Sequence, residues 1–106
     1  MAADYEAVKE EATRYANEVR SQMPVERVFL FGSYAKGTAD ELSDVDICFF
    51  FRDYEGKERV DMGIRLLDIA CGYKAYFEPH VFETADIERK NPFVNEIMST
   101  GVEIKE

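Results

Sequence analysis

Two aspartates separated by one residue, Asp44 and Asp46, open an apolar segment near the middle of the chain. Alternate residues of a β-strand point to the same face, so both carboxylates would share one side of a strand here. Like charges held that close repel each other, and a divalent cation between them relieves the repulsion. Carboxylate oxygens are hard ligands that suit Mg²⁺ carrying the phosphates of a nucleotide. The pattern therefore predicts a metal site at the start of this strand.

A second signal, Gly32 followed by Ser33, stands where the apolar run 28–31 ends. Glycine adopts backbone angles that other residues avoid, so the chain can turn sharply out of a strand at this point. The hydroxyl and backbone N–H of Ser33 would then open a helical turn, a geometry that binds phosphate oxygens. The same hydroxyl is equally suited to capping that turn, and Lys36 either adds a positive charge for phosphate or is a solvated lysine. We predict a nucleotide-binding turn formed by Gly32, Ser33 and Lys36.

Gly32-Ser33, ten intervening residues and then Asp44-Val45-Asp46 resemble the signature of the DNA polymerase β-type nucleotidyltransferase superfamily. The short chain is similar to the minimal nucleotidyltransferases of prokaryotes, many of which pair with an all-helical partner of the HEPN family. The resemblance implies Mg²⁺-dependent transfer of a nucleoside monophosphate, AMP from ATP, to an acceptor hydroxyl at a two-metal site. It also implies that Asp44 and Asp46 are catalytic metal ligands.

The third catalytic and metal-binding carboxylate that the family places on a neighbouring strand corresponds here to Glu78. The family usually has aspartate at this position, and glutamate is one methylene longer, so its reach to a shared metal differs. A surface-exposed Glu78 is the alternative, and nucleotide could then bind with weak or absent transfer. His80 shares the predicted face of Glu78 and has either a structural or a catalytic role. Tyr34 and Tyr76 are candidates for stacking on a base.

Composition and charge restrict the classes of function. The 106 residues suffice for one domain, residues 1–106, with a single core. The net charge of −9 argues against nucleic acid as the partner, since phosphate binding needs clustered basic residues. No apolar run approaches about 18 residues and the first residues are acidic, so we expect a cytoplasmic protein without a membrane span. Cys48 and Cys71 lie in apolar stretches and are expected to be buried structural thiols.

The predicted fold class is α/β (α+β), a small mixed β-sheet with helices packed on one face, as the nucleotidyltransferase resemblance implies. Hydrophobic periodicity and the positions of proline and glycine define the expected elements. These are a helix over 3–22, strands over 25–31 and 44–52, a helix over 57–72, a strand over 74–83, a turn over 85–90, a helix over 92–100 and a short strand over 102–104. Pro79 removes a backbone donor, so its strand is expected at an edge of the sheet or at a bulge.

The predicted strand over 44–52 has two different faces. Its odd-numbered residues are all apolar and should form the core under the helices. Its even-numbered face begins with the two aspartates and becomes apolar at Cys48 and Phe50. With helices on one side only, this face would expose Phe50 to a partner or to a second copy of the chain. In the helix over 57–72 we expect the inward positions to be Val60, Ile64, Leu67 and Cys71.

Three functional hypotheses follow. In the first, the chain is a nucleotidyltransferase whose acceptor hydroxyl is on a partner protein, because no second domain is expected to hold a smaller acceptor. The partner implied by the resemblance is a HEPN-type helical protein. In the second, the chain is a non-catalytic, antitoxin-like subunit that neutralises a HEPN-type ribonuclease by occlusion. A nucleotide-responsive regulatory domain, with affinity but no turnover, is a third alternative.

Overall fold

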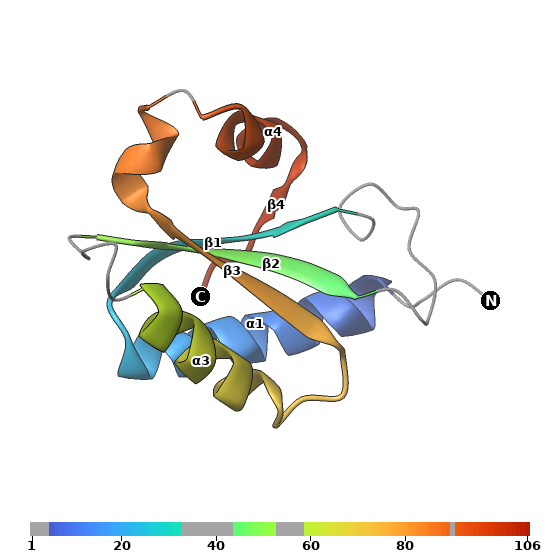
Figure 1. Ribbon diagram of the computed structural model, residues 1–106. Coiled ribbons are helices and arrows are strands. Elements are labelled where there is room, and N and C mark those ends of the chain that lie inside the picture. The colour runs from blue at the N-terminus through green and yellow to red at the C-terminus, as the bar shows by residue number, and fades with distance from the viewer. Residues whose placement is uncertain (1–4, 33–43, 53–58, 90) are drawn as a thin grey trace.

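The computed structural model describes residues 5–32, 44–52, 59–89 and 91–106 (Figure 1). The elements in chain order are α1 (Tyr5–Gln22), β1 (Val25–Phe31), β2 (Val45–Phe51), α3 (Arg59–Ala70), β3 (Phe77–Glu83), the 3₁₀ helix η2 (Thr84–Ile87), α4 (Pro92–Thr100) and β4 (Val102–Glu103). Each expected element is found, with ends displaced by no more than a few residues. Among these residues, no helix is both long enough and apolar enough to cross a membrane.

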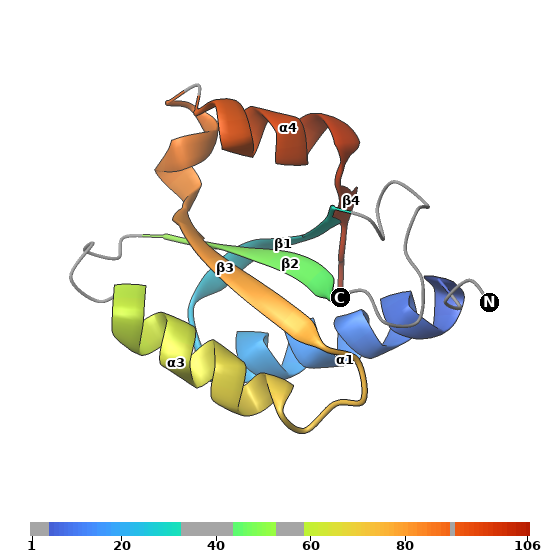
Figure 2. The same cartoon turned by 45° about the vertical axis from the view of Figure 1, so that its right-hand side comes forward.

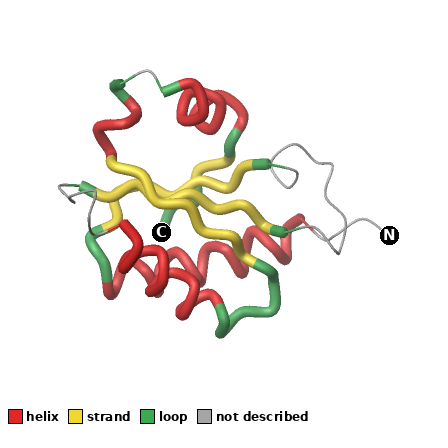
Figure 3. Tube along the Cα trace, viewed as in Figure 1, coloured by secondary structure: helices red, strands yellow, loops and turns green. Residues whose placement is uncertain are grey.

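The strands form one mixed sheet in the order β3-β2-β1-β4 (Figure 3). β1 is antiparallel to β2 and to β4, whereas β2 and β3 are parallel. The register places Phe31 opposite Asp46, and Asp46 opposite Glu78. β3 is an edge strand, as Pro79 predicted. The end of β1 and the starts of β2 and β3 therefore meet at one end of the sheet.

Helices α1 and α3 cover one face of this sheet, below it in Figures 1 and 2. The odd-numbered residues of β2 face these two helices and are buried, as the alternation predicted. Tyr15 of α1 is fully buried, and its ring meets the ring of Phe49 edge-on at 5.4 Å. Its hydroxyl donates a 2.7 Å hydrogen bond to the carbonyl oxygen of Leu66 in α3. This bond satisfies the polar atom that the tyrosine brings into the core.

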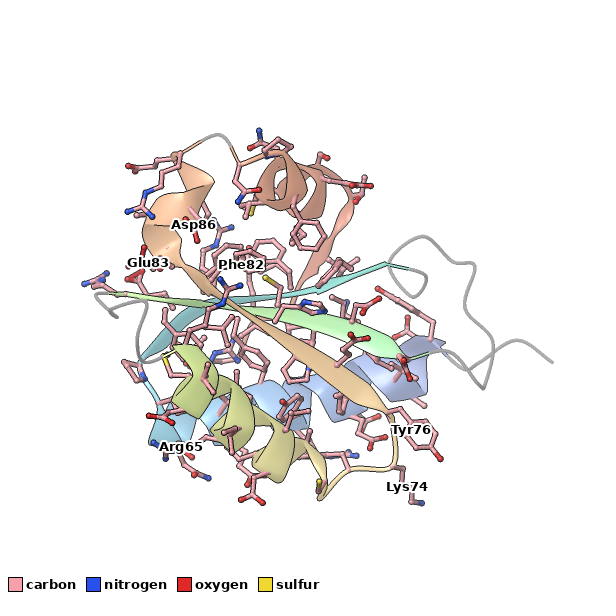
Figure 4. All side chains as sticks on the ribbon, in the orientation of Figure 1. Arg65, Lys74, Tyr76, Phe82, Glu83 and Asp86 are labelled. Carbon is pink, nitrogen blue, oxygen red and sulfur yellow. The ribbon has the colours of Figure 1, made fainter. Side chains whose placement is uncertain are left out.

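The opposite face of the sheet is covered by η2 and α4, which lie above it in both views (Figures 1 and 2). Val94 and Ile97 of α4 pack with Phe50 and Phe82 in a second apolar cluster, and Phe82 lies beneath α4 in Figure 4. Phe50 is fully buried, and its ring stacks on that of Phe82 at 5.7 Å. The predicted fold class is confirmed, but helices pack on both faces, and the prediction that Phe50 is exposed for a partner is wrong.

Well-defined ends allow α4 to return over the sheet. The Asn91 side chain accepts hydrogen bonds of 2.9 and 3.4 Å from two backbone N–H groups of the first turn, and Pro92 occupies the first helical position. At the other end, a Cβ on Gly101 would lie 2.5 Å from the Ile97 carbonyl oxygen and 2.9 Å from that of Leu30. Only glycine therefore lets the chain leave α4 and pair directly with β1.

Helix α3 turns a different face to the core from the one predicted. Its buried side chains are Met62, Leu66 and Ala70. The expected inward residues are instead exposed: Val60, Ile64, Leu67 and, just beyond the helix, Cys71. The buried set repeats every four residues and the exposed set every three or four, so helical periodicity alone does not choose between them. The result is an apolar stripe on the outer side of the helix.

Candidate functional site

A sharp turn at Gly32 ends β1 beside the start of β2. Gly32 has φ of +72°, in the left-handed region where any side chain is strained. A Cβ at this position would overlap Asp46 Oδ2 and lie 3.2 Å from Asp46 Cγ. The glycine is therefore required both by the backbone conformation and by the carboxylate packed against it.

Three side chains, those of Asp46, Glu78 and His80, converge at the same end of the sheet. One ligand atom from each lies within 4.8 Å of the other two. The parallel register sets Asp46 of β2 beside Glu78 of β3, and His80 is two residues further along the same face. Asp46 and His80 are partly buried, and Glu78 is exposed. Two carboxylates and an imidazole form a donor set that a divalent cation can use.

The His80 ring is held by two phenylalanine rings. It packs edge-on against the ring of Phe31 at 5.1 Å and lies 6.4 Å from the ring of Phe93. Its buried Nε2 has no hydrogen-bond partner within the described part of the chain. The nearest carboxylate atom, Asp46 Oδ1, is 3.6 Å away, which is too far for a hydrogen bond. This nitrogen fits contact with a bound cation or with a polar group of a substrate.

The predicted site residues differ in how the structure places them. Gly32, Asp46 and Glu78 come together as expected. Asp44 precedes β2, is exposed, and does not belong to the group of three convergent side chains. Ser33, Lys36 and Tyr34 lie outside the described residues, and so do the remaining positions of the signature between Gly32 and Asp44.

Tyr76 and Cys48 lie close to this site in the sheet, on β-strand residues or just before them. The side chain of Tyr76 is largely exposed just before β3, and its carbonyl oxygen accepts a 2.8 Å hydrogen bond from the Val45 N–H. Cys48 lies next to Asp46 on the same face of β2, and burial, assisted by the charge of Asp86, raises the pKa of its thiol. The thiol therefore stays protonated, which confirms the predicted structural role. The same prediction is wrong for Cys71, which is exposed.

A pocket of about 200 Å³ opens beside Gly32, between the end of β1 and α4. Its lining is mainly apolar, and it consists of Phe31, Gly32, Phe93, Glu96, Ile97 and Thr100. The pocket was not predicted from the sequence because it depends on α4 returning over the sheet. The only signal for that return was the pair Asn91-Pro92 at the start of a helix.

Comparison with known families decides the class of this protein. Residues 12–99 match the family described as nucleotidyltransferase domain. The chain belongs to the nucleotidyltransferase family. This range contains Gly32, Asp46, Glu78 and His80, so the convergent side chains lie inside the family's domain. The fold predicted from the signature is confirmed.

Relatives of this nucleotidyltransferase include a protein of Methanocaldococcus jannaschii that is named a protein adenylyltransferase. The two are 30% identical over 81 residues, which cover 76% of this chain and 79% of the relative. A crystal structure described as a nucleotidyltransferase from Sulfolobus solfataricus is 26% identical, with a TM-score of 0.62, covering 80% of this chain and 75% of that one.

A toxin–antitoxin crystal structure with AMP-PNP has a TM-score of 0.57 at 16% identity, covering 92% of this chain and 72% of that one. At this identity the likeness shows a shared fold. The same sheet and helices therefore occur in a chain of that toxin–antitoxin structure.

Proposed function

We propose that this nucleotidyltransferase transfers AMP from ATP to a hydroxyl group of a partner protein. In this reaction the acceptor hydroxyl loses its proton to water and its oxygen bonds to the α-phosphorus. The bond between the α-phosphorus and the α,β-bridging oxygen breaks, and pyrophosphate leaves. The observation that carries the proposal is the convergence of Asp46, Glu78 and His80 beside Gly32, within a chain of the nucleotidyltransferase family.

The carboxylates of Asp44, Asp46 and Glu78 are the proposed Mg²⁺ ligands. When bound, Mg²⁺ would neutralise phosphate charge and lower the pKa of the attacking hydroxyl. Asp46 and Glu78 are neighbours across two paired strands, an arrangement of like charges that destabilises a sheet without a cation. His80 Nε2 is the nitrogen available to contact the cation or to accept a hydrogen bond from the acceptor hydroxyl.

We propose that the turn at Gly32 and the pocket beside it bind different parts of the nucleotide. Gly32 packs directly against the Asp46 carboxylate, and we propose that the turn that follows it binds phosphate through Ser33 and Lys36. The pocket is large enough for a planar heterocycle, and Phe93 offers it a partly exposed ring. We assign the base of the nucleotide to this pocket.

The choice of ATP and of a protein acceptor rests on three observations. The relative from M. jannaschii is named a protein adenylyltransferase. The toxin–antitoxin structure of the same fold contains AMP-PNP. The net charge of −9 would repel a nucleic-acid acceptor. A HEPN-type helical protein is the proposed partner, as the resemblance to minimal nucleotidyltransferases implies.

The proposal is tested by incubating the purified chain with Mg²⁺, ATP labelled at the α-phosphate and the protein encoded beside it in the genome. We expect AMP on a hydroxyl side chain of that protein, located by mass spectrometry, and none with the Asp46→Asn variant. Label that appears only on added RNA would refute a protein acceptor.

Two features favour the alternative, a non-catalytic antitoxin-like subunit that occludes a HEPN-type ribonuclease. Glu78 replaces the family's usual aspartate and is exposed, while Asp44 lies apart from the convergent group. The Glu78→Ala variant separates the two functions, since transfer requires this carboxylate and occlusion does not. Glu88→Ala, at an exposed position beyond η2, is the matched control. Ribonuclease inhibition that survives Glu78→Ala, with no transfer by the wild-type chain, would establish the alternative.

A further inference from the structure

The pocket beside Gly32 is mainly apolar, but two polar side chains, those of Glu96 and Thr100, are part of its lining. Both belong to α4 and stand four residues apart, so they lie on the same side of the helix. In Figure 2 the C-terminal end of α4 descends to β4, which pairs with β1. None of the described residues that line the pocket is basic. The chemistry of Glu96 and Thr100 therefore decides which polar groups a bound base can present to α4.

Both side chains offer hydrogen-bond acceptors. Glu96 is exposed, and an ionised carboxylate only accepts hydrogen bonds, with sites for about four of them. The Thr100 hydroxyl donates its single proton to the Glu96 carbonyl oxygen at 2.8 Å, which leaves its lone pairs as acceptors. The C-terminal end of a helix also carries a partial negative charge, and the last turn of α4 contains no basic residue to offset it. This wall of the pocket therefore attracts N–H donors and repels carbonyl oxygens.

Nucleotide bases differ in what they present to such a wall. Adenine, cytosine and guanine carry an exocyclic amine with two N–H donors. Hypoxanthine has a carbonyl oxygen where adenine has its amine, and uracil has one where cytosine has its amine. The two N–H groups of one amine can reach two acceptors, as the Glu96 carboxylate and the Thr100 hydroxyl require. A carbonyl oxygen in the same place would face a negative charge with no proton between them.

The aromatic part of the pocket provides affinity without selecting a base. The ring of Phe93 is partly exposed and meets the ring of Phe31 edge-on at 5.6 Å. Phe93 precedes Glu96 by three residues, so its ring is on the same side of α4 as the two acceptors. Stacking on an aromatic ring is open to every base because every base has a π-face. Selection among bases is therefore left to Glu96 and Thr100.

We propose that Glu96 and Thr100 select a nucleotide whose base carries an exocyclic amine. The inference rests on the proposed nucleotide donor and on the assignment of its base to this pocket. For ATP the amine is the 6-amino group of adenine. Glu96 is then a specificity-determining residue that contacts the base and takes no part in the transfer step.

The test is calorimetry of the full chain in Mg²⁺ with ATP and with inosine triphosphate (ITP), which replaces the 6-amino group by a carbonyl oxygen. We expect ATP to bind about tenfold to a hundredfold more tightly than ITP, the range that a hydrogen bond to a charged group contributes. CTP and UTP form a second pair that differs in the same way, and CTP should bind more tightly than UTP.

Glu96→Gln separates base selection from a structural role. The amide keeps the size of the side chain but can donate as well as accept, so the ratio of ATP to ITP affinity should fall by about tenfold. Glutamine suits an exposed helix position, so the unfolding midpoint should stay unchanged. A general loss of structure would weaken ATP and ITP alike and leave their ratio unaltered. Glu88→Gln, at an exposed carboxylate outside the pocket, is the matched control and should keep the wild-type ratio.

The outcomes distinguish this inference from the proposed transfer. ATP bound no more tightly than ITP, or an affinity ratio unchanged in Glu96→Gln, would overturn the inference and leave the transfer proposal intact. GTP or CTP bound more tightly than ATP, with ITP and UTP still rejected, would support selection of an amine and overturn ATP as the donor. Failure of every nucleotide to bind in Mg²⁺ would overturn both.

Discussion

Replacing Gly32 with alanine should damage the site more than the fold. The alanine must keep the left-handed backbone conformation, which costs about 1 to 2 kcal/mol for a residue with a Cβ. Its methyl group also overlaps Asp46 Oδ2. That oxygen is the end of a side chain, so rotation of Asp46 relieves the overlap at a cost of about 1 kcal/mol. The rotation also removes the carboxylate from Glu78 and His80. Because small domains are stable by about 5 to 15 kcal/mol, the variant should remain folded.

Loss of function should be the larger effect. Displacing a group by 1 Å in such a site can reduce the rate about a hundredfold. Urea denaturation measures the stability of Gly32→Ala, and labelled-ATP turnover in Mg²⁺ measures its activity. Gly72→Ala is the control, because its Cβ would make an ordinary 3.5 Å contact with the Ile69 carbonyl oxygen and its φ is not left-handed. If Gly32→Ala behaves like Gly72→Ala in both assays, the contact with Asp46 does not organise the site.

Three further predictions test the fold. Phe50→Ala should lower the free energy of unfolding by about 3 to 5 kcal/mol, because Phe50 is fully buried; a urea titration showing a loss below about 1 kcal/mol would contradict this packing. Alkylation followed by mass spectrometry should modify Cys71 alone in the native protein and Cys48 only in urea, and rapid labelling of both in the folded state would count against the buried thiol. The Arg27 guanidinium beside Glu103 lowers the pKa of that carboxyl below its ordinary 4.5, so its stabilising effect is present at neutral pH and is lost as the pH falls through the lowered value. Glu103→Gln should therefore be less stable than wild type at pH 7 and equal to it in strong acid, whereas a difference that persists there would exclude this ion pair as the cause.

Local sequence signals predicted the elements of the site well. The change from an apolar run to Gly32, and from the aspartates to a second apolar run, located β1, β2 and the turn after β1. The edge position of β3 followed from Pro79. The pairing of Asp46 with Glu78 was expected from the family resemblance, and the parallel register of β2 and β3 brings them together.

Contacts between distant segments were harder to predict. Phe50 looked exposed because nothing near it in the sequence shows that α4 returns over that face of the sheet. The side of α3 that packs inward was assigned wrongly because the helix has two apolar stripes, and only packing against α1 and the sheet selects Leu66 over Ile64. The same ambiguity hid the outer apolar stripe.

Calorimetry of ATP binding, with Mg²⁺ and with EDTA, tests most directly the claim that Asp46 and Glu78 form a metal-dependent nucleotide site. We expect the wild-type chain to bind ATP only when Mg²⁺ is present, and we expect Asp46→Asn not to bind ATP. The unfolding midpoint of Asp46→Asn in EDTA should be no lower than that of wild type, because the amide removes a repulsion between neighbouring carboxylates. Equal affinity for ATP in Mg²⁺ and in EDTA, or undiminished binding of ATP by Asp46→Asn, would contradict a metal-dependent nucleotide site at these carboxylates.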